Sequence, residues 1–145
     1  MIPELLATVC AGLFADAAIY VSLVEHPARL ECGTELAVRE FGPSYRRGAV
    51  MQASLAAIGC LAGILGWAQR GGRPLLVGAV ALGLAIPFTL LVILPTNKRL
   101  LDPGLDRTSS EATQLLDRWG RLHAVRSLLG AVAFGCLAWH LAGRG

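Results

Sequence analysis

The fold is decided by a stretch near the end of the chain, "RWGRLHAVRSLLGAVAFGCLAWHLAG" (Arg118 to Gly143). It is long enough to cross a bilayer as one helix, for which about 20 residues are needed, and most of it is apolar. The whole chain has the same character, since 54% of its residues are hydrophobic, 16% are charged and the mean hydropathy is +0.58. Soluble domains carry more charge, so the composition indicates an integral membrane protein.

Apolar blocks recur along the chain at the length of a membrane span. They cover Pro3–Val24, Gly48–Gln69, Pro74–Leu94 and roughly Arg118–Ala142. We therefore predict an all-α fold, an integral membrane four-helix up-and-down bundle, formed by a single membrane domain over residues 1–145. The tight "RGGR" connection (Arg70 to Arg73) predicts that the second and third helices form an antiparallel hairpin.

Two longer polar connections are expected, over Glu25–Arg47 and Pro95–Asp117. Pro27 is expected to end the first helix, because proline disrupts a helix interior. Within the first connection, the mixed pattern of Ala28–Phe41 suits a short amphipathic helix on the membrane surface. That helix would act as a lid or merely span the distance between two membrane helices.

The basic residues predict how the chain is oriented. Because each span carries the chain to the opposite side of the membrane, both long connections lie on the same face. The basic residues of that face are Arg29, Arg39, Arg46, Arg47, Lys98, Arg99, Arg107, Arg118 and Arg121, and those of the opposite face are Arg70, Arg73 and Arg144. We therefore predict a multi-pass protein of the cell membrane. The positive-inside rule places its long loops in the cytoplasm and both of its termini outside the cell. The lipid bilayer is thus a partner, and the mixed loop charges without interleaved aromatic residues exclude nucleic acid.

Small residues and cysteines in the spans are typical of packing. Gly59 and Gly63 lie four residues apart in "GCLAG", a spacing that permits close helix contact. The four cysteines show no paired spacing and indicate neither a disulfide framework nor a zinc site.

Polar groups inside the spans are candidates for function, because a membrane makes them expensive. At about 1.5 Å per residue, His123, Tyr20 and Gln52 lie on the order of 7 Å below the face of the long loops, and Asp16 and Arg126 lie roughly 12 Å below it. We therefore expect a polar layer inside the bundle.

The matching depth of Asp16 and Arg126 suggests an ion pair across the bundle, in which each charge offsets the desolvation of the other. Alternatively, Asp16 is protonated and hydrogen-bonded to a backbone carbonyl, and Arg126 extends toward the cytoplasmic surface.

Four polar clusters converge at the same membrane face, and they include "EHPARL" (Glu25 to Leu30), "PTNKRLLD" (Pro95 to Asp102) and "RWGRLHAVRS" (Arg118 to Ser127). With these motifs the sequence resembles the anthrone oxygenase-like family, small four-helix membrane proteins long catalogued as a domain of unknown function. The resemblance covers essentially the whole chain. It implies a membrane oxygenase or monooxygenase that oxidises an apolar phenolic or polyketide-type substrate with molecular oxygen at the cytoplasmic-face pocket.

The resemblance also suggests roles for individual residues, since oxidation of an anthrone needs a base and hydrogen-bond donors for the enolate. The candidates are His26 and His123 as bases, Asn97 and Tyr20 as donors, Arg126 or Arg46 as the cation, and Asp16, Arg46, Gln52 and Trp119 as further substrate contacts. For Trp119 and His26, an interfacial anchor and a helix-end residue are the structural alternatives.

A metal cofactor stays open. His26 and His123, with Glu25 or Asp16, would form a histidine and carboxylate site for copper or iron. No HxxxH or ExxH repeat supports such a site, so cofactor-free chemistry is the other expectation.

Two non-catalytic classes remain beside the oxygenase. One is a partner-binding bundle or a transport component, and the other is a proton or small-ion carrier along Asp16, Tyr20 and His123. Because four helices leave little internal space, a substrate would enter laterally from lipid or be shared with a second subunit of a homo-oligomer.

Overall fold

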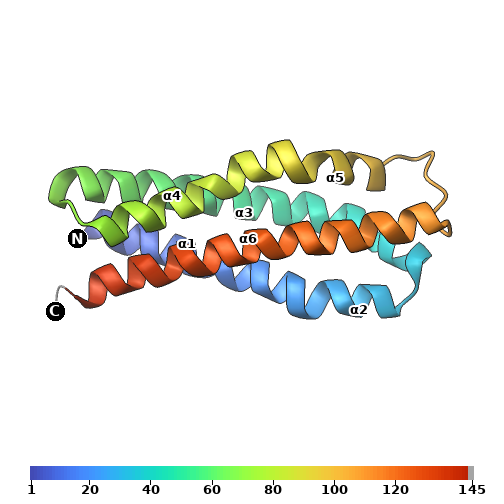
Figure 1. The fold of residues 1–145 in the computed structure, drawn as a ribbon, viewed down its shortest axis with the longest axis horizontal. Coiled ribbons are helices and arrows are strands. Elements are labelled where there is room, and N and C mark those ends of the chain that lie inside the picture. The colour runs from blue at the N-terminus through green and yellow to red at the C-terminus, as the bar shows by residue number, and fades with distance from the viewer. Residues whose placement is uncertain (144–145) are drawn as a thin grey trace.

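The computed structural model describes residues 1–143, which form a bundle of long helical rods lying side by side (Figure 1). The elements in chain order are α1 (Ile2–Tyr20), the π-helical turn η1 (Val21–Glu25), α2 (His26–Glu31), α3 (Thr34–Arg70), α4 (Arg73–Phe88), the π-helical turn η2 (Thr89–Ile93), α5 (Leu94–Leu100) and α6 (Ser110–Ala142). No strand occurs between residues 1 and 143. The predicted all-α bundle is confirmed, and Arg144, counted above, lies outside the described residues.

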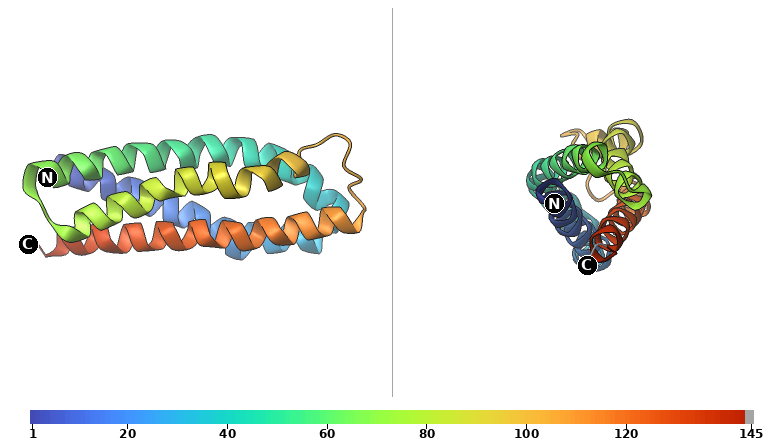
Figure 2. Two further views of the ribbon diagram at one scale, coloured as in Figure 1. Left: turned by 45° about the horizontal axis from the view of Figure 1, so that its top comes forward. Right: turned by 90° about the vertical axis from the view of Figure 1, so that its left-hand side faces the viewer.

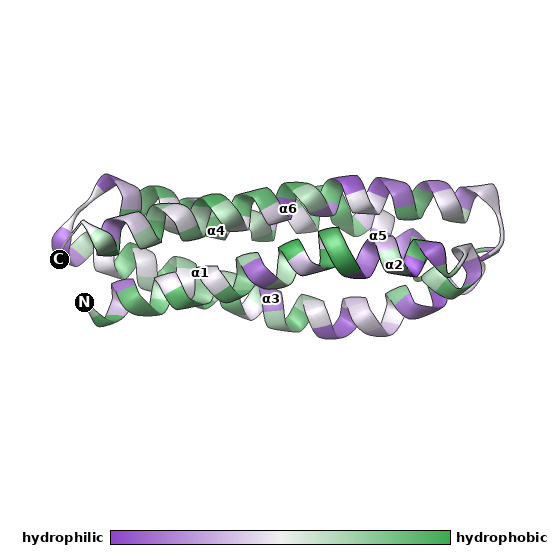
Figure 3. Cartoon of the chain, turned by 90° about the horizontal axis from the view of Figure 1, so that it is seen from below, coloured by the Kyte–Doolittle hydropathy of each residue, from purple (hydrophilic) through white to green (hydrophobic). Residues whose placement is uncertain are grey.

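Each rod is long and apolar enough to cross a membrane. The rods are Ile2–Glu31, Thr34–Arg70, Arg73–Leu100 and Ser110–Ala142, so the chain is a multi-pass membrane protein. With 28 to 37 residues, they measure about 42 to 56 Å, which exceeds a hydrocarbon core of about 30 Å. One end of the bundle therefore extends beyond the hydrocarbon, and Figure 3 shows hydrophilic residues gathered over the end that contains α2 and α5.

The expected loop over Glu25–Arg47 is wrong, because this region is helical except for Cys32 and Gly33. Pro27 does not end the first rod. It lies in the first turn of α2, directly after η1, where the missing N–H is tolerated.

The second connection is also shorter than expected. Pro95 lies in the first turn of α5 after η2, and α5 continues to Leu100. Since α6 begins at Ser110, only residues 101–109 connect the last two rods, instead of Pro95–Asp117.

Glycines make the two short turns possible. Gly33 has φ of 89°, and Gly71 and Gly72 have φ of 71° and 107°, a backbone region that favours glycine. The predicted hairpin at "RGGR" is confirmed, since α3 ends at Arg70 and α4 begins at Arg73.

The rods form a ring in the order α1, α3, α4, α6, and the end-on view in Figure 2 shows the four corners of this ring. Small residues bring the rods close together. A Cβ on Gly59 would lie 2.6 Å from Leu82 Cδ2, and one on Gly63 would lie 2.6 Å from Ala79 Cβ. The close contact predicted for these two glycines is confirmed, and it leaves little space inside this half of the bundle.

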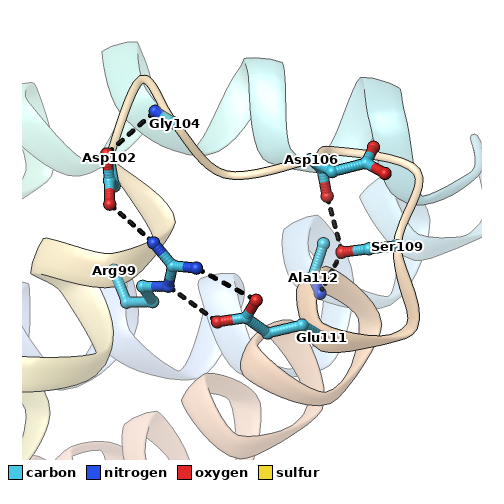
Figure 4. Close-up of polar contacts among 7 residues, drawn as sticks. All are labelled: Arg99, Asp102, Gly104, Asp106, Ser109, Glu111 and Ala112. Atoms are coloured by element: carbon cyan, nitrogen blue, oxygen red, sulfur yellow. Dashed lines mark hydrogen bonds and ion pairs between the residues drawn. The ribbon is translucent and has the colours of Figure 1, made fainter.

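The connection between α5 and α6 is held by an ion-pair cluster, shown in Figure 4. Arg99 donates to Asp102 Oδ2 over 2.6 Å and to both carboxylate oxygens of Glu111 over 2.6 and 3.0 Å. The Gly104 N–H, which donates to Asp102, lowers the pKa of that carboxyl, and Arg99 acts in the same direction. Ser109 caps α6 by accepting from the Ala112 N–H. These contacts fix the start of α6, which carries the candidate site.

Candidate functional site

A cavity of about 40 Å³ lies in the polar half of the bundle and is lined by residues from all four rods. Of the residues singled out from sequence, it brings together Gln52 on α3, Asn97 on α5, and Trp119, His123 and Arg126 on α6. The predicted polar layer is present in part: Gln52, His123 and Arg126 are buried, together with Asn97, whereas Tyr20 and Asp16 are exposed. The volume suits a few water molecules and is smaller than a tricyclic compound.

Arg126 is stabilised by an amide and an aromatic ring. Its Nη2 donates to Gln52 Oε1 over 2.8 Å, and its guanidinium carbon lies 5.4 Å from the centre of the Phe14 ring. Phe14 is fully buried, and so its ring offers a desolvated face to the cation.

The expected ion pair between Asp16 and Arg126 is wrong. Asp16 is exposed on the outer face of α1, two residues and therefore about 200° around the helix from buried Phe14. Tyr20, four residues later, shares that outer face and is 54% exposed. The proposed ladder of Asp16, Tyr20 and His123 consequently does not run through the bundle interior.

The imidazole of His123 is held by a hydrogen bond at one ring nitrogen and by a stacking contact with an aromatic ring. Its Nδ1 lies 3.0 Å from Ser22 Oγ in η1, and its ring stacks on Trp119 with 4.7 Å between the ring centres. Among the described residues, the hydrogen bond of the His123 ring uses Nδ1, which leaves Nε2 without a protein partner. Because the side chain lines the cavity, Nε2 is the nitrogen available to a ligand there.

His26 is buried and contacts Trp119, but it is not among the residues that line the cavity. Its ring centre lies 5.0 Å from that of Trp119. The ring packs directly on the backbone of α6, where a Cβ on Gly120 would lie 2.6 Å from His26 Nε2. The glycine therefore makes room for the imidazole.

Arg29 is the main residue that sequence reasoning missed. It is buried, donates to Glu25 and to Ser44 Oγ, and forms an ion pair with Glu40 Oε2 over 2.6 Å. Its guanidinium also lies 5.6 Å from the Trp119 ring centre. The four-residue spacing of Glu25 and Arg29 was a usable signal, but it indicates a pair only if the helix continues through Pro27.

Asn97 has the most unusual environment in the cavity. It is 1% exposed, and neither its Oδ1 nor its Nδ2 has a hydrogen-bonding partner. A buried amide without partners is costly, so such groups are usually satisfied by water or a ligand. Asn97 therefore offers one donor and one acceptor to whatever enters the cavity.

Other residues singled out from sequence lie outside the cavity. Arg46 is exposed on α3. Of the suggested metal ligands His26, His123 and Glu25, the carboxylate of Glu25 is already engaged, because its Oε1 accepts from Arg29 and Ser44. No group of three histidine, cysteine, aspartate or glutamate side chains is placed to hold a metal among the described residues. The arrangement does not fit a copper or iron centre of this composition.

Two grooves adjoin the cavity and share lining residues with it. An apolar groove of about 140 Å³ lies between α3 and α4, and it shares Tyr45, Ala49, Gln52 and Arg126 with the cavity. A more polar groove of about 380 Å³ lies between α1 and α3, includes Asp16, Tyr20 and Arg47, and shares Gln52. Gln52 thus borders all three spaces.

Comparison with known proteins identifies the family. The family model described as "Anthrone oxygenase" matches residues 41–136. The anthrone oxygenase tpcL of Aspergillus fumigatus is 31% identical over 140 residues, which cover 88% of this chain and 86% of that protein. The chain belongs to the anthrone oxygenase family. An anthrone oxygenase of Claviceps purpurea is 28% identical over 137 residues, covering 82% of this chain and 77% of that protein. No solved structure matches the chain.

Membership of the anthrone oxygenase family supports an oxygenase-like function in general terms. The resemblance stated from the sequence motifs is confirmed. The range matched by the anthrone oxygenase family model contains Gln52, Asn97, Trp119, His123 and Arg126, whereas His26 and Arg29 precede it.

Proposed function

We propose that this protein oxidises an anthrone-type substrate, a planar apolar phenolic tricycle with an activated methylene, to the corresponding anthraquinone. One molecule of oxygen is consumed: one atom becomes the new carbonyl oxygen, and the other leaves as water with the two methylene hydrogens. The observation that carries the proposal is the cavity lined by both His123, whose Nε2 has no protein partner, and Asn97, whose amide is unpaired, in a chain of the anthrone oxygenase family.

The proposed roles follow from the contacts. His123 Nε2 takes a proton from the methylene, which converts the anthrone into an electron-rich enolate that oxygen attacks. Asn97 Nδ2 donates to the enolate oxygen, and Arg126, held by Gln52, supplies positive charge. Because these groups are fixed before the substrate arrives, they stabilise the developing charge without reorganisation.

Substrate access is proposed to be lateral. The cavity of about 40 Å³ cannot hold a tricycle, but the groove between α3 and α4 adds about 140 Å³ and is mostly lined by apolar side chains. The apolar rings would occupy this groove with the reacting edge at Gln52 and Arg126. Since all four rods of one chain line the cavity, this geometry does not need a second subunit.

Blocking the groove tests the route. Ala53 is exposed in the groove, so Ala53→Trp is expected to raise KM for the anthrone at least tenfold. Ile58→Trp adds the same side chain at an exposed α3 position outside the groove and should leave KM within twofold. Equal KM values for both variants would contradict lateral entry between α3 and α4.

The proposed function is tested by oxygen uptake with emodin anthrone and the full chain in lipid nanodiscs, with protein-free nanodiscs as the control for spontaneous oxidation. His123→Gln should lower kcat by about 10² or more, since general-base catalysis contributes about 10²- to 10⁴-fold. Arg46→Gln, at an exposed position outside the cavity, should keep the parental rate. An unchanged rate in His123→Gln would remove His123 as the base.

Two further outcomes have a clear meaning. Elemental analysis of the same preparation shows whether copper or iron accompanies the activity, and stoichiometric metal lost in a His26→Ala and His123→Ala double variant would overturn the cofactor-free scheme. No oxygen uptake above the protein-free control would favour a non-catalytic role as a partner-binding or transport bundle.

We also propose that the end of the bundle containing α2 and α5 faces the cytoplasm. The support is the bias of basic residues, because Arg29, Arg39, Arg46, Arg47 and Lys98 belong to this end and Arg70 and Arg73 to the other. The active cavity would then lie near the cytoplasmic boundary of the membrane, where α3 changes from the polar segment before Gly48 to the apolar segment after it.

A further inference from the structure

A chain of three hydrogen bonds connects the backbone of α1 to the imidazole of His123. Ser127 Oγ lies 2.8 Å from the carbonyl oxygen of Ala18, Ser22 Oγ lies 2.8 Å from Ser127 Oγ, and His123 Nδ1 lies 3.0 Å from Ser22 Oγ. Ser127 and His123 are 8% and 4% exposed and Ser22 between them is half-buried, so both ends of the chain are shielded from water.

The direction of this chain follows from counting hydrogens. A carbonyl oxygen only accepts, so Ser127 donates its single hydroxyl hydrogen to Ala18. The contact between the two serines then requires Ser22 to donate to Ser127, which uses the only hydroxyl hydrogen of Ser22. His123 must therefore donate from Nδ1 to Ser22, because no other assignment satisfies all three contacts.

We infer that Ser22 and Ser127 are positioning residues that hold His123 in the tautomer with the proton on Nδ1 and the lone pair on Nε2. The catalytic meaning of this inference rests on the proposed function. In the opposite tautomer, Nε2–H would point to the cavity as a donor and would be unable to take a proton from a substrate methylene.

The helix geometry explains why Ser22 reaches His123. Ser22 lies in the π-helical turn η1, whose wider turn changes the angular position of its residues relative to α1. Ala18 lies in the last turn of α1 and contributes the carbonyl that anchors the chain. On α6, Ser127 and His123 are four residues apart and share one face, and Ser127 Oγ also lies 3.3 Å from the His123 carbonyl oxygen. The fixed backbone of two rods thus determines the tautomer.

The direct test is nitrogen-15 NMR of histidine-labelled full-length protein in nanodiscs at neutral pH, without substrate. The chain has three histidines, and His26→Gln and His140→Gln variants assign the signals. We expect His123 to show a protonated Nδ1 and an unprotonated Nε2. A protonated Nε2 with an unprotonated Nδ1 would overturn the inference, whatever the activity of the protein.

Variants test whether the serines cause this preference. Ser127→Ala should give a mixed tautomer signal for His123 and lower kcat about tenfold with an unchanged KM, and Ser127→Thr, which keeps the hydroxyl, should restore both. The matched control is Ser54→Ala, which removes an exposed helical serine that donates only to the Val50 carbonyl. A single Nδ1–H tautomer with parental kcat in Ser127→Ala would refute the positioning role.

The two hypotheses fail in distinguishable ways. If the wild-type protein shows the Nδ1–H tautomer but no oxygen uptake, the proposed function fails and the hydrogen-bond assignment stands. If it oxidises anthrone while His123 carries its proton on Nε2, the positioning role fails and another route for the proton is required. If Ser127→Ala does not fold, the wild-type spectrum still decides the assignment.

Discussion

Asn97 combines a cost in stability with a candidate role in binding, and this combination gives a test at the residue scale. An unpaired buried polar group costs about 1–3 kcal/mol, and both polar atoms of the Asn97 amide are unpaired. Asn97→Leu should therefore raise the thermal unfolding midpoint without substrate and lower kcat/KM for the anthrone at least tenfold. Differential scanning fluorimetry and oxygen uptake measure the two effects.

Thr96 provides the matched control for Asn97. Its hydroxyl is also buried and unpaired, but the residue does not line the cavity. Thr96→Val should give a stability gain without a loss of activity. A lower midpoint together with parental activity in Asn97→Leu would show that the amide is a structural group whose partner is an internal water.

Gly120 tests whether the backbone of α6 must leave room for His26. A Cβ there would lie 2.6 Å from Nε2 and 2.8 Å from Cδ2 of His26, so the imidazole must move from its place beside Trp119. Gly120→Ala should destabilise the protein by about 1–3 kcal/mol, the usual cost of overpacking. Chemical unfolding in detergent, followed by tryptophan fluorescence, measures the difference.

Gly135→Ala, on the same helix, is the control for Gly120, because apart from its chain neighbours and the nearby backbone of α6 no atom lies within 4 Å of the added Cβ. Replacing this helical glycine should stabilise the protein by roughly 0.5–1 kcal/mol. Similar losses of stability in both variants would mean that helix packing in general, and not the contact with His26, controls the response.

At the scale of the element, the π-helical turns explain why two rods continue where loops were expected. Each precedes a proline, since η1 is followed by His26–Pro27 and η2 by Leu94–Pro95. A π turn contains one more residue than an α turn between the same carbonyl and N–H partners. It therefore accommodates an extra residue while the helix on both sides keeps its packing.

This property predicts different effects for two single-residue deletions. Deleting Val24 inside η1 should convert the turn to α-helix and leave most packing intact, but it should displace Ser22 and lower the oxidation rate. Deleting Val9 in α1, which is equally exposed at 50%, should rotate the residues on one side by about 100° and prevent folding. Size-exclusion chromatography and thermal unfolding give the comparison, and equal damage from both deletions would contradict it.

At the scale of the whole molecule, the orientation is testable with the native cysteines. Cys32 is exposed in the turn between α2 and α3, whereas Cys10, Cys60 and Cys136 are buried or partly buried in the rods. If the proposed orientation is right, a membrane-impermeant maleimide should fail to label Cys32 in intact cells and should label it after permeabilisation.

A cysteine at the opposite end supplies the control for orientation. In a Cys32→Ser protein, Arg73→Cys lies at the exposed start of α4 and should react in intact cells. The reverse pattern of labelling would invert the proposed orientation and move the cavity to the outer boundary of the membrane.

Much of the site was predictable because burying a polar group in an apolar span is costly. Gln52, His123 and Arg126 stand out in hydrophobic sequence for that reason, whereas Asn97 and Trp119 were named from the family resemblance, and all five line the cavity. The errors have a different cause. Asp16 stands out equally but lies on the exposed face, and depth along a helix carries no information about its rotation.

The sequence by itself determined the membrane class, the four rods, the hairpin at "RGGR" and the close contacts of Gly59 and Gly63. These features depend on composition and local spacing, which act before the helices meet. Only the tertiary structure decided that Arg126 contacts Gln52, that Arg29 joins Glu40 and Ser44, and that Ser22 contacts His123. Those contacts join different rods, and so they depend on the rotation of each rod about its axis, which local sequence spacing does not specify. In the first rod, the π-helical turn η1 contributes to this rotation at Ser22.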